Sequence, residues 1–333
     1  MIKLSVLDQS PIRSGSDAGS ALQETIDLAR HCEKLGYYRY WLAEHHASDA
    51  LAGCSPEVLL GRLGAETQSI RIGSGGVMLP HYSPYKVAEN FKLLETLYPG
   101  RVDLGVGRAP GTDPFTAAAL RYGASRRTEY FPTMVADLQA LLYDQPLATP
   151  GITEARAFPI TQSPPQLWML GSSDDSIGFA ADAGLPYSFA YFINPQIDSN
   201  IFKRYKEQFK PGPGLKEPYC SLSVFVICAE TDEQAELLSH SRDLWFLRLL
   251  QGAPGPVPRV EEALEYEYSK YELQAIHANR ESRAVGDPQT VKAKLVKLAQ
   301  QFDVDELVIL TITHDLEARR RSYELLADAW IIH

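Results

Sequence analysis

Tyr37-Tyr38-Arg39-Tyr40-Trp41-Leu42-Ala43-Glu44-His45-His46 starts as an aromatic-rich segment typical of a buried β-strand and ends in one carboxylate and two imidazoles. Burying such titratable groups costs several kcal/mol unless each of them finds a partner. Histidine is also the side chain whose charge changes close to neutral pH. We therefore expect the end of this strand to have a function, and the segments that gather around it decide which one.

The segment belongs to a regular alternation of short apolar runs and amphipathic stretches along the chain. The amphipathic stretches carry apolar residues at i, i+3, i+4 and i+7, which is the spacing of one helix face. Predicted strands cover residues 4–8, 40–44, 70–77, 102–106, 166–170, 187–192, 221–228 and 306–312. Predicted helices cover residues 21–35, 84–97, 126–142, 176–183, 197–209, 232–250, 291–302 and 316–330.

Eight strands with intervening helices predict an α/β fold, a closed (β/α)₈ TIM barrel formed by a single domain, residues 1–333. An open doubly wound sheet is the alternative, but eight regular units favour closure. Such a barrel needs roughly 250 residues, and we place the surplus in insertions at about 145–165 and 252–283. Both insertions are loop-like in composition. The second is long enough to be a lid over an active site, or else a solvated surface excursion.

Composition excludes several classes of partner. The chain has 333 residues, 45% of them hydrophobic, a net charge of −10 and no basic stripe, so nucleic acid and anionic membranes are not expected partners. The four cysteines show no C-x-x-C spacing, which favours reduced thiols in a cytoplasmic protein. The first residues read directly as a strand without a targeting segment, and no run of about 18 apolar residues predicts a membrane span.

Two segments at predicted strand ends, where a barrel of this type forms its active site, favour an anion. Gly171-Ser172-Ser173-Asp174-Asp175-Ser176 leads into a predicted helix, and backbone N–H groups at a helix start together with serine hydroxyls favour a phosphate. Arg108 follows another strand and offers a forked guanidinium for the same group. Alternatively, Ser173 and Ser176 only cap the helix, and Arg108 is an ordinary ion-pair partner. Asp174 and Asp175 have to point away from any bound phosphate.

Gly75-Gly76 ends the third predicted strand. Adjacent glycines weaken a strand unless a ligand or another backbone approaches closely, so a flat ring system against this strand is one explanation and a simple bulge is the other. Gly105-x-Gly107 does not indicate a dinucleotide site, because Pro110 occupies the last position of that motif and the segment does not open a first βαβ unit.

Glu44, His45 and His46 give only a weak metal-site signal. Neighbouring strand residues point to opposite faces, and no H-x-x-x-H or H-E-x-x-H spacing is present. We expect either Glu44 or His45 to face the pocket, with the other and His46 holding the framework. A histidine at a strand end beside a carboxylate is a candidate for acid/base chemistry.

In this order and spacing, five segments resemble the bacterial luciferase-like family of flavin-dependent monooxygenases, and the resemblance covers nearly the whole chain. They are Trp41-Leu42-Ala43-Glu44-His45-His46, Gly73-Ser74-Gly75-Gly76-Val77-Met78-Leu79-Pro80, Ser83-Pro84 to Ala88-Glu89, Tyr98-Pro99-Gly100-Arg101-Val102-Asp103-Leu104-Gly105-Val106-Gly107-Arg108 and Phe179-Ala180-Ala181-Asp182-Ala183-Gly184-Leu185-Pro186. The chain looks most like single-chain members of that family.

The resemblance implies a cofactor and a set of site residues. The cofactor would be FMN, taken up in its reduced form as a co-substrate. His45 matches the family's catalytic histidine, Glu44 its preceding carboxylate, and Gly75-Gly76 a position beside the flavin ring where the family often has a non-proline cis peptide. The residues that match the phosphate site are Arg108, Gly171, Ser172, Ser173 and Ser176.

The implied reaction is oxidation of a small organic, aldehyde-like substrate by O₂ through a flavin C4a-peroxide, with His45 transferring a proton. No nicotinamide-binding signature is present, so a separate flavin reductase would supply reduced FMN, and family habit suggests a homodimer packed through the helices after the second and third strands. Gly107 stands where light-emitting members often have a cysteine, which counts against luminescence. Three aromatic residues are candidates for the wall of an apolar substrate pocket or for ordinary packing: Phe192, Tyr191 and Tyr82.

Three other functions stay open. One is a flavin-binding protein without turnover, and another is a deazaflavin-dependent oxidoreductase of the same fold. The third keeps the barrel and replaces the chemistry with hydrolysis by paired carboxylates, for which the strand ends offer Asp8 and Glu44. A glycosidase would not need the phosphate-like segment, which argues against the third function.

Overall fold

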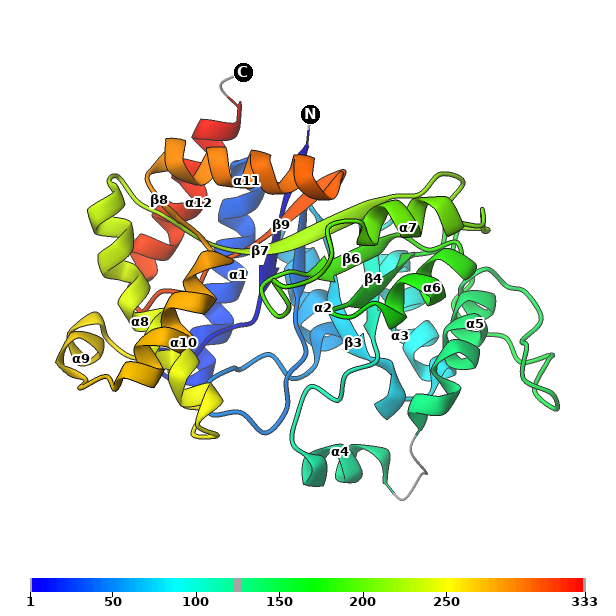
Figure 1. The fold of residues 1–333 in the computed structure, drawn as a ribbon. Helices are drawn as coiled ribbons and strands as arrows, with labels where there is room; N and C mark the ends of the chain where they lie inside the picture. Colours follow the sequence, from blue (N-terminus) through cyan, green and yellow to red (C-terminus); the bar gives the residue numbers. More distant parts are fainter. Residues whose placement is uncertain (1, 123–126, 332–333) are drawn as a thin grey trace.

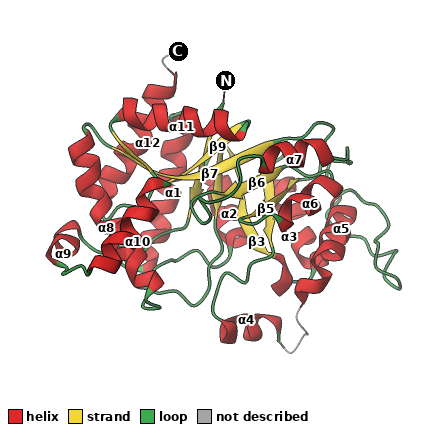
Figure 2. Ribbon diagram, viewed as in Figure 1, coloured by secondary structure: helices red, strands yellow, loops and turns green. Residues whose placement is uncertain are grey.

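Within residues 2–122 and 127–331, which the computed structural model describes, eight parallel strands close into a barrel (Figures 1 and 2). The strand order is β6-β5-β4-β3-β2-β1-β9-β7, and pairing of β6 with β7 closes the ring. The barrel strands are β1 (Lys3–Asp8), β2 (Arg39–Leu42), β3 (Arg71–Met78), β4 (Val102–Gly107), β5 (Gln166–Gly171), β6 (Tyr187–Ala190), β7 (Cys220–Cys228) and β9 (Glu306–Leu310). The predicted TIM barrel is therefore confirmed. A short further strand, β8 (Ala284–Gly286), pairs with the end of β7.

Helices surround the barrel and bury their apolar faces against it (Figure 2). They are α1 (Ala18–Lys34), α2 (Pro56–Glu66), α3 (Pro84–Leu97), α4 (Pro114–Arg121), α5 (Phe131–Leu142), α6 (Asp175–Asp182), α7 (Ile201–Gln208), α8 (Asp232–Leu250), α9 (Val260–Glu265), α10 (Lys270–Glu281), α11 (Pro288–Phe302) and α12 (Leu316–Ile331). In the part of the chain that the structure describes, no helix has both the length and the apolar character that crossing a membrane requires.

Several predicted strands are two residues too long at their carboxyl ends. The strands end at Leu42, Ala190 and Leu310, where the prediction continued to 44, 192 and 312, and within the described residues only single backbone bonds from Ala43 to Asp8 and from Phe192 to Ser223 follow the first two. Local bonding explains the difference: the His45 N–H donates to Gly53, and the Tyr191 N–H donates to Phe189, so neither amide is available for a neighbouring strand.

The helix predictions match α3 and α8, agree with α6 and α12 to within one residue at each end, and start three residues late for α1 and α11. We did not predict α2 or α4, each of which starts with a proline after a Ser or Asp and buries few residues, so its apolar periodicity is weak. For the predicted helix 126–142, residue 126 lies outside the described residues, Arg127–Tyr130 forms a 3₁₀ turn, and α5 starts at Phe131. Helix α7 starts four residues later than predicted, because the Asp198 side chain accepts a hydrogen bond from the Asn200 N–H in a turn.

The two insertions differ from each other. Residues 145–165 contain neither helix nor strand, in agreement with their loop-like composition. The loop prediction for 252–283 is wrong, because this insertion contains α9 and α10, which lie beside α8 (Figure 1). Its helical signal is a capping box, in which Ser269 and Glu272 satisfy each other's backbone N–H groups at the start of α10. Backbone bonds from Val257 to Ile12 and Ser14 hold the insertion against the loop after β1.

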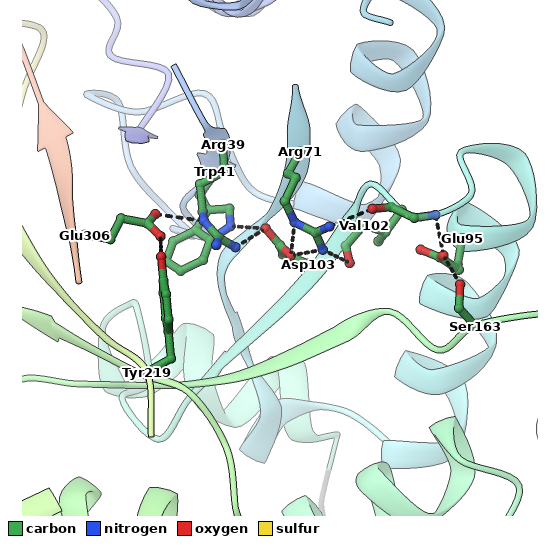
Figure 3. A network of polar contacts seen from close by, with 10 residues as sticks. Arg39, Trp41, Arg71, Glu95, Val102, Asp103, Ser163, Tyr219 and Glu306 are labelled. Atoms are coloured by element: carbon green, nitrogen blue, oxygen red, sulfur yellow. Dashed lines mark hydrogen bonds and ion pairs between the residues drawn. The ribbon is translucent and has the colours of Figure 1, made fainter. Parts of the chain in front are cut away.

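A buried polar network fills the amino-terminal end of the barrel (Figure 3). Arg39, at the start of β2, donates from Nε to Glu306 on β9 and from Nη1 to Asp103 on β4, each at 2.7 Å. Trp41 Nε1 and the Tyr219 hydroxyl donate to the same two carboxylates, at 3.0 and 2.8 Å. Arg39 is 1% exposed and both carboxylates are 0% exposed, so the network joins three strands through charges that water does not screen.

We predict that Arg39→Ala lowers the free energy of unfolding by about 3–5 kcal/mol, because it leaves Asp103 and Glu306 buried without their shared cation. Urea unfolding followed by circular dichroism measures the loss. Arg62→Ala is the matched control, since Arg62 forms an i, i+4 ion pair with Glu66 at a side-chain exposure of 61% and should change stability by less than about 1 kcal/mol. Equal effects of the two substitutions would contradict a structural role for the buried network.

Candidate active site

One cavity of about 410 Å³ lies at the carboxyl ends of the barrel strands. All nine residues predicted for the site line it, although they come from four different strand ends: Glu44, His45, Gly75, Gly76, Arg108, Gly171, Ser172, Ser173 and Ser176. Among the described residues that line the cavity, none comes from the insertion 252–283. The geometry thus brings the predicted residues together, while their individual roles stay predictions.

Gly75 and Gly76 lie where side chains would not fit. A Cβ on Gly75 would come within 2.7 Å of Leu7 Cδ1, and one on Gly76 within 2.5 Å of the Gly105 carbonyl oxygen. The pairing between β3 and β4 shifts between Gly75 and Val77, so the bulge that was one of two explanations is present. The Gly75–Gly76 peptide is cis. Close packing within the sheet accounts for the glycines, and the same small residues leave one wall of the cavity without side chains.

The segment from Gly171 to Ser176 forms the start of α6 at another side of the cavity. The Ser176 hydroxyl donates to the Ser173 carbonyl at 2.8 Å and lies 2.9 Å from the Tyr187 hydroxyl. The N-cap of α6 is Asp174, without a side-chain cap bond, so Ser173 and Ser176 are not the caps that we considered as an alternative. A Cβ on Gly171 would lie 1.9 Å from Ser176 Oγ, which explains why glycine is needed there.

Two residues that support this segment were not predicted. Tyr187 on β6 contacts Ser176, and Asn194 after β6 donates from Nδ2 to the Ser172 carbonyl at 3.0 Å. The pairing of β5 with β6 brings both residues beside the segment. Nothing in the local sequence signals these contacts, because they depend on the register of the two strands.

Arg108 lines the cavity and also forms an ion pair. Its Nη2 donates to Asp175 Oδ2 at 2.8 Å, with side-chain exposures of 40% and 67%. Asp174 is held by Arg204 at 2.9 Å, and neither aspartate is among the described residues that line the cavity. The ordinary ion pair that we considered for Arg108 is therefore present. An anion that uses Arg108 has to share this guanidinium with Asp175 or displace that carboxylate.

Glu44 is bound by His46 and Tyr82 and lines the cavity together with His45, so our expectation that only one of Glu44 and His45 faces the pocket is wrong. Glu44 Oε1 lies 2.8 Å from His46 Nε2 and accepts a hydrogen bond from the Tyr82 hydroxyl at 2.8 Å, while Oε2 accepts from the Met78 N–H at 3.2 Å. Burial raises the pKa of Glu44, and these hydrogen bonds oppose the rise. The reason for the error is that β2 ends at Leu42, so the strand alternation that we assumed does not extend to residues 44–46.

His45 lines the cavity with an imidazole that lacks a partner at one nitrogen. Its Nδ1 is buried and accepts or donates no hydrogen bond within the described part of the chain. Burial, and to a smaller extent the neighbouring His46, lower the pKa of His45 to about 4. The ring is thus neutral at neutral pH, which is the form that can accept a proton from a bound molecule.

Hydrolysis by paired carboxylates would need both Asp8 and Glu44 in the cavity, and the structure does not bring them together there. Asp8 is 0% exposed and accepts hydrogen bonds from Arg319 Nη2 at 2.7 Å and the Ser10 N–H at 2.8 Å. It does not belong to the described lining of the cavity, whereas Glu44 does. Of the three aromatic candidates for the wall, Phe192 lines the cavity, while Tyr191 packs against Phe302 at 5.5 Å between ring centroids.

The family model described as "Luciferase-like monooxygenase" matches residues 2–306. The chain belongs to this family. It is 38% identical over 327 residues to a luciferase-like monooxygenase of Escherichia coli (strain K12), covering 98% of this chain and 96% of that one. It is also 38% identical over 330 residues to N-acetyl-S-alkylcysteine monooxygenase of Bacillus subtilis (strain 168), covering 99% and 98%. Its enzyme class is therefore that of a flavin-dependent, luciferase-like monooxygenase.

Solved structures of the luciferase-like fold agree with the barrel described above. The crystal structure of apo-MsnO8 gives a TM-score of 0.89 at 37% identity and covers 100% of this chain and 99% of that one. Two more distant barrels show the fold alone. The first is the oxygenating constituent of 3,6-diketocamphane monooxygenase from Pseudomonas putida in complex with FMN, with a TM-score of 0.72 at 17% identity over 98% of this chain and 96% of that one. The second is an F420-dependent secondary alcohol dehydrogenase, with a TM-score of 0.69 at 14% identity over 98% of both chains.

The lowered pKa of His45 predicts a pH-dependent contribution to stability. Between the ordinary histidine pKa of 6.5 and about 4, the unfolded chain binds a proton at this position and the folded chain does not. Falling pH therefore destabilises the native protein relative to His45→Gln, by about 1–3 kcal/mol when the pH reaches about 4. Urea unfolding at a series of pH values measures the difference, with the exposed His277→Gln as control. Parallel stability curves for the native protein and His45→Gln would contradict a buried, neutral His45.

Proposed function

We propose that this protein binds FMN in the cavity, takes it up in reduced form, and uses it with O₂ to oxidise a small organic substrate. The observation that carries the proposal is the convergence of all nine predicted residues on one cavity. A volume of about 410 Å³ falls within the range of cofactor pockets.

The residues around the cavity fit the two chemically different parts of FMN. The wall at Gly75 and Gly76, together with the apolar Leu7 and Trp41, suits a flat aromatic ring. The backbone and hydroxyl groups from Gly171 to Ser176 suit a phosphate, because the first N–H groups of α6 have no side-chain cap. Arg108 adds a cation to the phosphate end. When it is bound in reduced form, FMN supplies the activation of O₂.

His45 is the residue of this chain that we assign to proton transfer. Its imidazole is neutral, faces the cavity and has a free Nδ1 within the described residues. Glu44 does not hold the ring of His45. It holds His46 and Tyr82 instead, and so keeps the loop after β2 in place behind the cavity. We therefore retain His45 as the catalytic candidate and assign Glu44 to positioning.

The substrate and the partners are further parts of the proposal. Phe192, Ile193 and Leu170 give the cavity an apolar wall that suits an aldehyde-like molecule. The name of the N-acetyl-S-alkylcysteine monooxygenase relative adds organic sulfides as a second class. A separate flavin reductase in the cytoplasm would supply reduced FMN. We also propose a homodimer packed through α2 and α3, which expose Val58 and Leu97 at 74% and 57%; a purely monomeric sedimentation profile would overturn it.

We predict that Arg108→Gln weakens FMN binding about tenfold or more, because a charge-assisted hydrogen bond contributes about 1.5–3 kcal/mol. Asp175→Asn should strengthen it about two- to fivefold, because an exposed pair of this kind is worth about 0.2–1 kcal/mol. Calorimetric titration with FMN, reduced FMN and a deazaflavin measures the affinities. Riboflavin, which lacks the phosphate, is the matched control ligand, and neither substitution should change its affinity. If no flavin binds below about 1 mM, the flavin proposal fails; if FMN binding is insensitive to Arg108, only the phosphate site fails.

We predict that His45→Ala and His45→Gln lower turnover about 10²- to 10⁴-fold, which is the usual contribution of a positioned acid or base. The assay supplies reduced FMN through a reductase and measures O₂-dependent oxidation of an aldehyde or an alkyl sulfide. FMN affinity should stay within twofold of the native value, because His45 is not assigned to cofactor binding. His277→Gln serves as the control variant. Native turnover in both His45 variants would remove His45 from the mechanism.

A further inference from the structure

Arg242 on α8 is a buried cation beyond the described lining of the cavity. Its guanidinium carbon lies 5.0 Å from the ring centroids of Phe225 and Trp245 and 5.7 Å from that of Phe246. We call Phe225, Trp245 and Phe246 the aromatic cluster. Only 9% of Arg242 is exposed, and this residue has no assigned part in FMN binding or proton transfer.

The aromatic cluster lies close to two residues that line the cavity, Ser223 and Phe192. Ser223 on β7 lines the cavity, and Phe225 lies two residues further along the same strand. Side chains two residues apart share one face of a strand and are separated by roughly 7 Å. Phe192, which also lines the cavity, packs against the same group of side chains as Phe225 and Trp245. Arg242 thus contacts Phe225, a side chain that shares a strand face with the lining residue Ser223.

The guanidinium of Arg242 lacks hydrogen-bond acceptors in the described part of the chain. Its Nε and Nη1 are both buried and unpartnered. The adjacent carboxylate, Asp243, is already used, because it accepts hydrogen bonds from Arg283 Nη1 at 2.7 Å and Arg280 Nε at 2.8 Å. The three aromatic rings and Asp243 offset part of the charge of Arg242, but its buried Nε and Nη1 groups have no acceptor within the described residues, which is unfavourable.

The local charges leave a positive excess. Three arginines, Arg242, Arg280 and Arg283, lie beside the two carboxylates of Asp243 and Glu236. Burial, together with the charge of Arg283, lowers the pKa of Arg242 to about 9, which still leaves it a cation at neutral pH. A ligand anion would balance the excess and give the free N–H groups an acceptor.

We propose that Arg242 binds the carboxylate of the substrate, so that the enzyme oxidises small organic acids whose apolar part lies in the cavity beside Phe192. The inference rests on the proposed monooxygenase function and concerns the choice of substrate. Planar guanidinium and carboxylate groups form strong charge-assisted hydrogen bonds, and the aromatic cluster excludes water from that contact. A neutral aldehyde or ester would leave the guanidinium uncompensated.

A pair of probes that differ only in the charge tests the proposal. N-acetyl-S-methylcysteine and its methyl ester are titrated calorimetrically into the native protein, with and without FMN. We expect the acid to bind at least tenfold more tightly than the ester. We also expect the acid to change the fluorescence of Trp245, which is assigned by comparison with Trp245→Phe. Equal binding of acid and ester would overturn the proposal without any substitution.

Variants separate a ligand contact from a structural role. Arg242→Gln should lose the preference for the acid while it keeps the affinities for the ester and FMN, and Arg242→Lys should keep part of the preference. Arg248→Gln is the matched control, since Arg248 lies on the same helix and pairs with Glu262. An undiminished preference in Arg242→Gln would refute the carboxylate site. Failure of the native protein to bind any flavin would instead refute the proposed function, whatever the acid does.

Discussion

A single guanidinium holds two buried carboxylates that are more than two hundred positions apart in the sequence. Arg39 can reach Asp103 and Glu306 only if β2, β4 and β9 take one register, because each of these residues lies at or next to the start of its strand. A slipped register would leave a charge buried without compensation, which costs far more than the loss of one apolar contact. The network therefore specifies how the barrel closes, and the opposite strand ends meet in a defined arrangement as a consequence.

The site depends on the points at which this regular pairing stops. Past Leu42 the chain turns away from the ladder, and Glu44 can then reach His46 and the Met78 N–H instead of a position across a strand. At Gly75 and Gly76 the ladder shifts, and a Cβ at either position would meet a neighbouring atom at 2.7 Å or less. The regular strands hold the side chains of the site in fixed positions. The irregular backbone after the strand ends lets side chains and backbone N–H groups from several directions reach the same cavity. A regular strand end would direct neighbouring side chains to opposite faces.

The sequence alone predicted the barrel and the residues that meet at its mouth, because both follow from periodicity and from the rule that strand ends converge. It did not predict that Glu44 holds His46, since that contact requires the path of a loop whose bonds go to Gly53 and Gly111. The ion pair of Arg108 with Asp175 joins the ends of two strands, so no local sequence pattern predicts it. The contact of Arg242 with Phe225 also lies outside any sequence motif, so the sequence did not single out Arg242. Helix α10 could have been predicted from the sequence, because Ser269 and Glu272 form a capping box at its start. We overlooked this signal because the composition of the insertion is typical of a loop.

The two arginines near the cavity differ in what an anion gains by binding to them. The whole chain carries a net charge of −10, so a negative ligand is not attracted from a distance, and salt screens such fields beyond about 8 Å in any case. Local compensation decides instead. Arg108 is already paired with an exposed carboxylate, so a phosphate that binds there first loses the about 0.2–1 kcal/mol that this pair is worth. Arg242 is buried without an acceptor, so an anion there removes a penalty that the free protein carries. On this reasoning Asp175 reduces, without abolishing, what Arg108 contributes to the affinity for the cofactor phosphate, whereas no such competitor within the described residues reduces what Arg242 would contribute to the selectivity for a charged substrate.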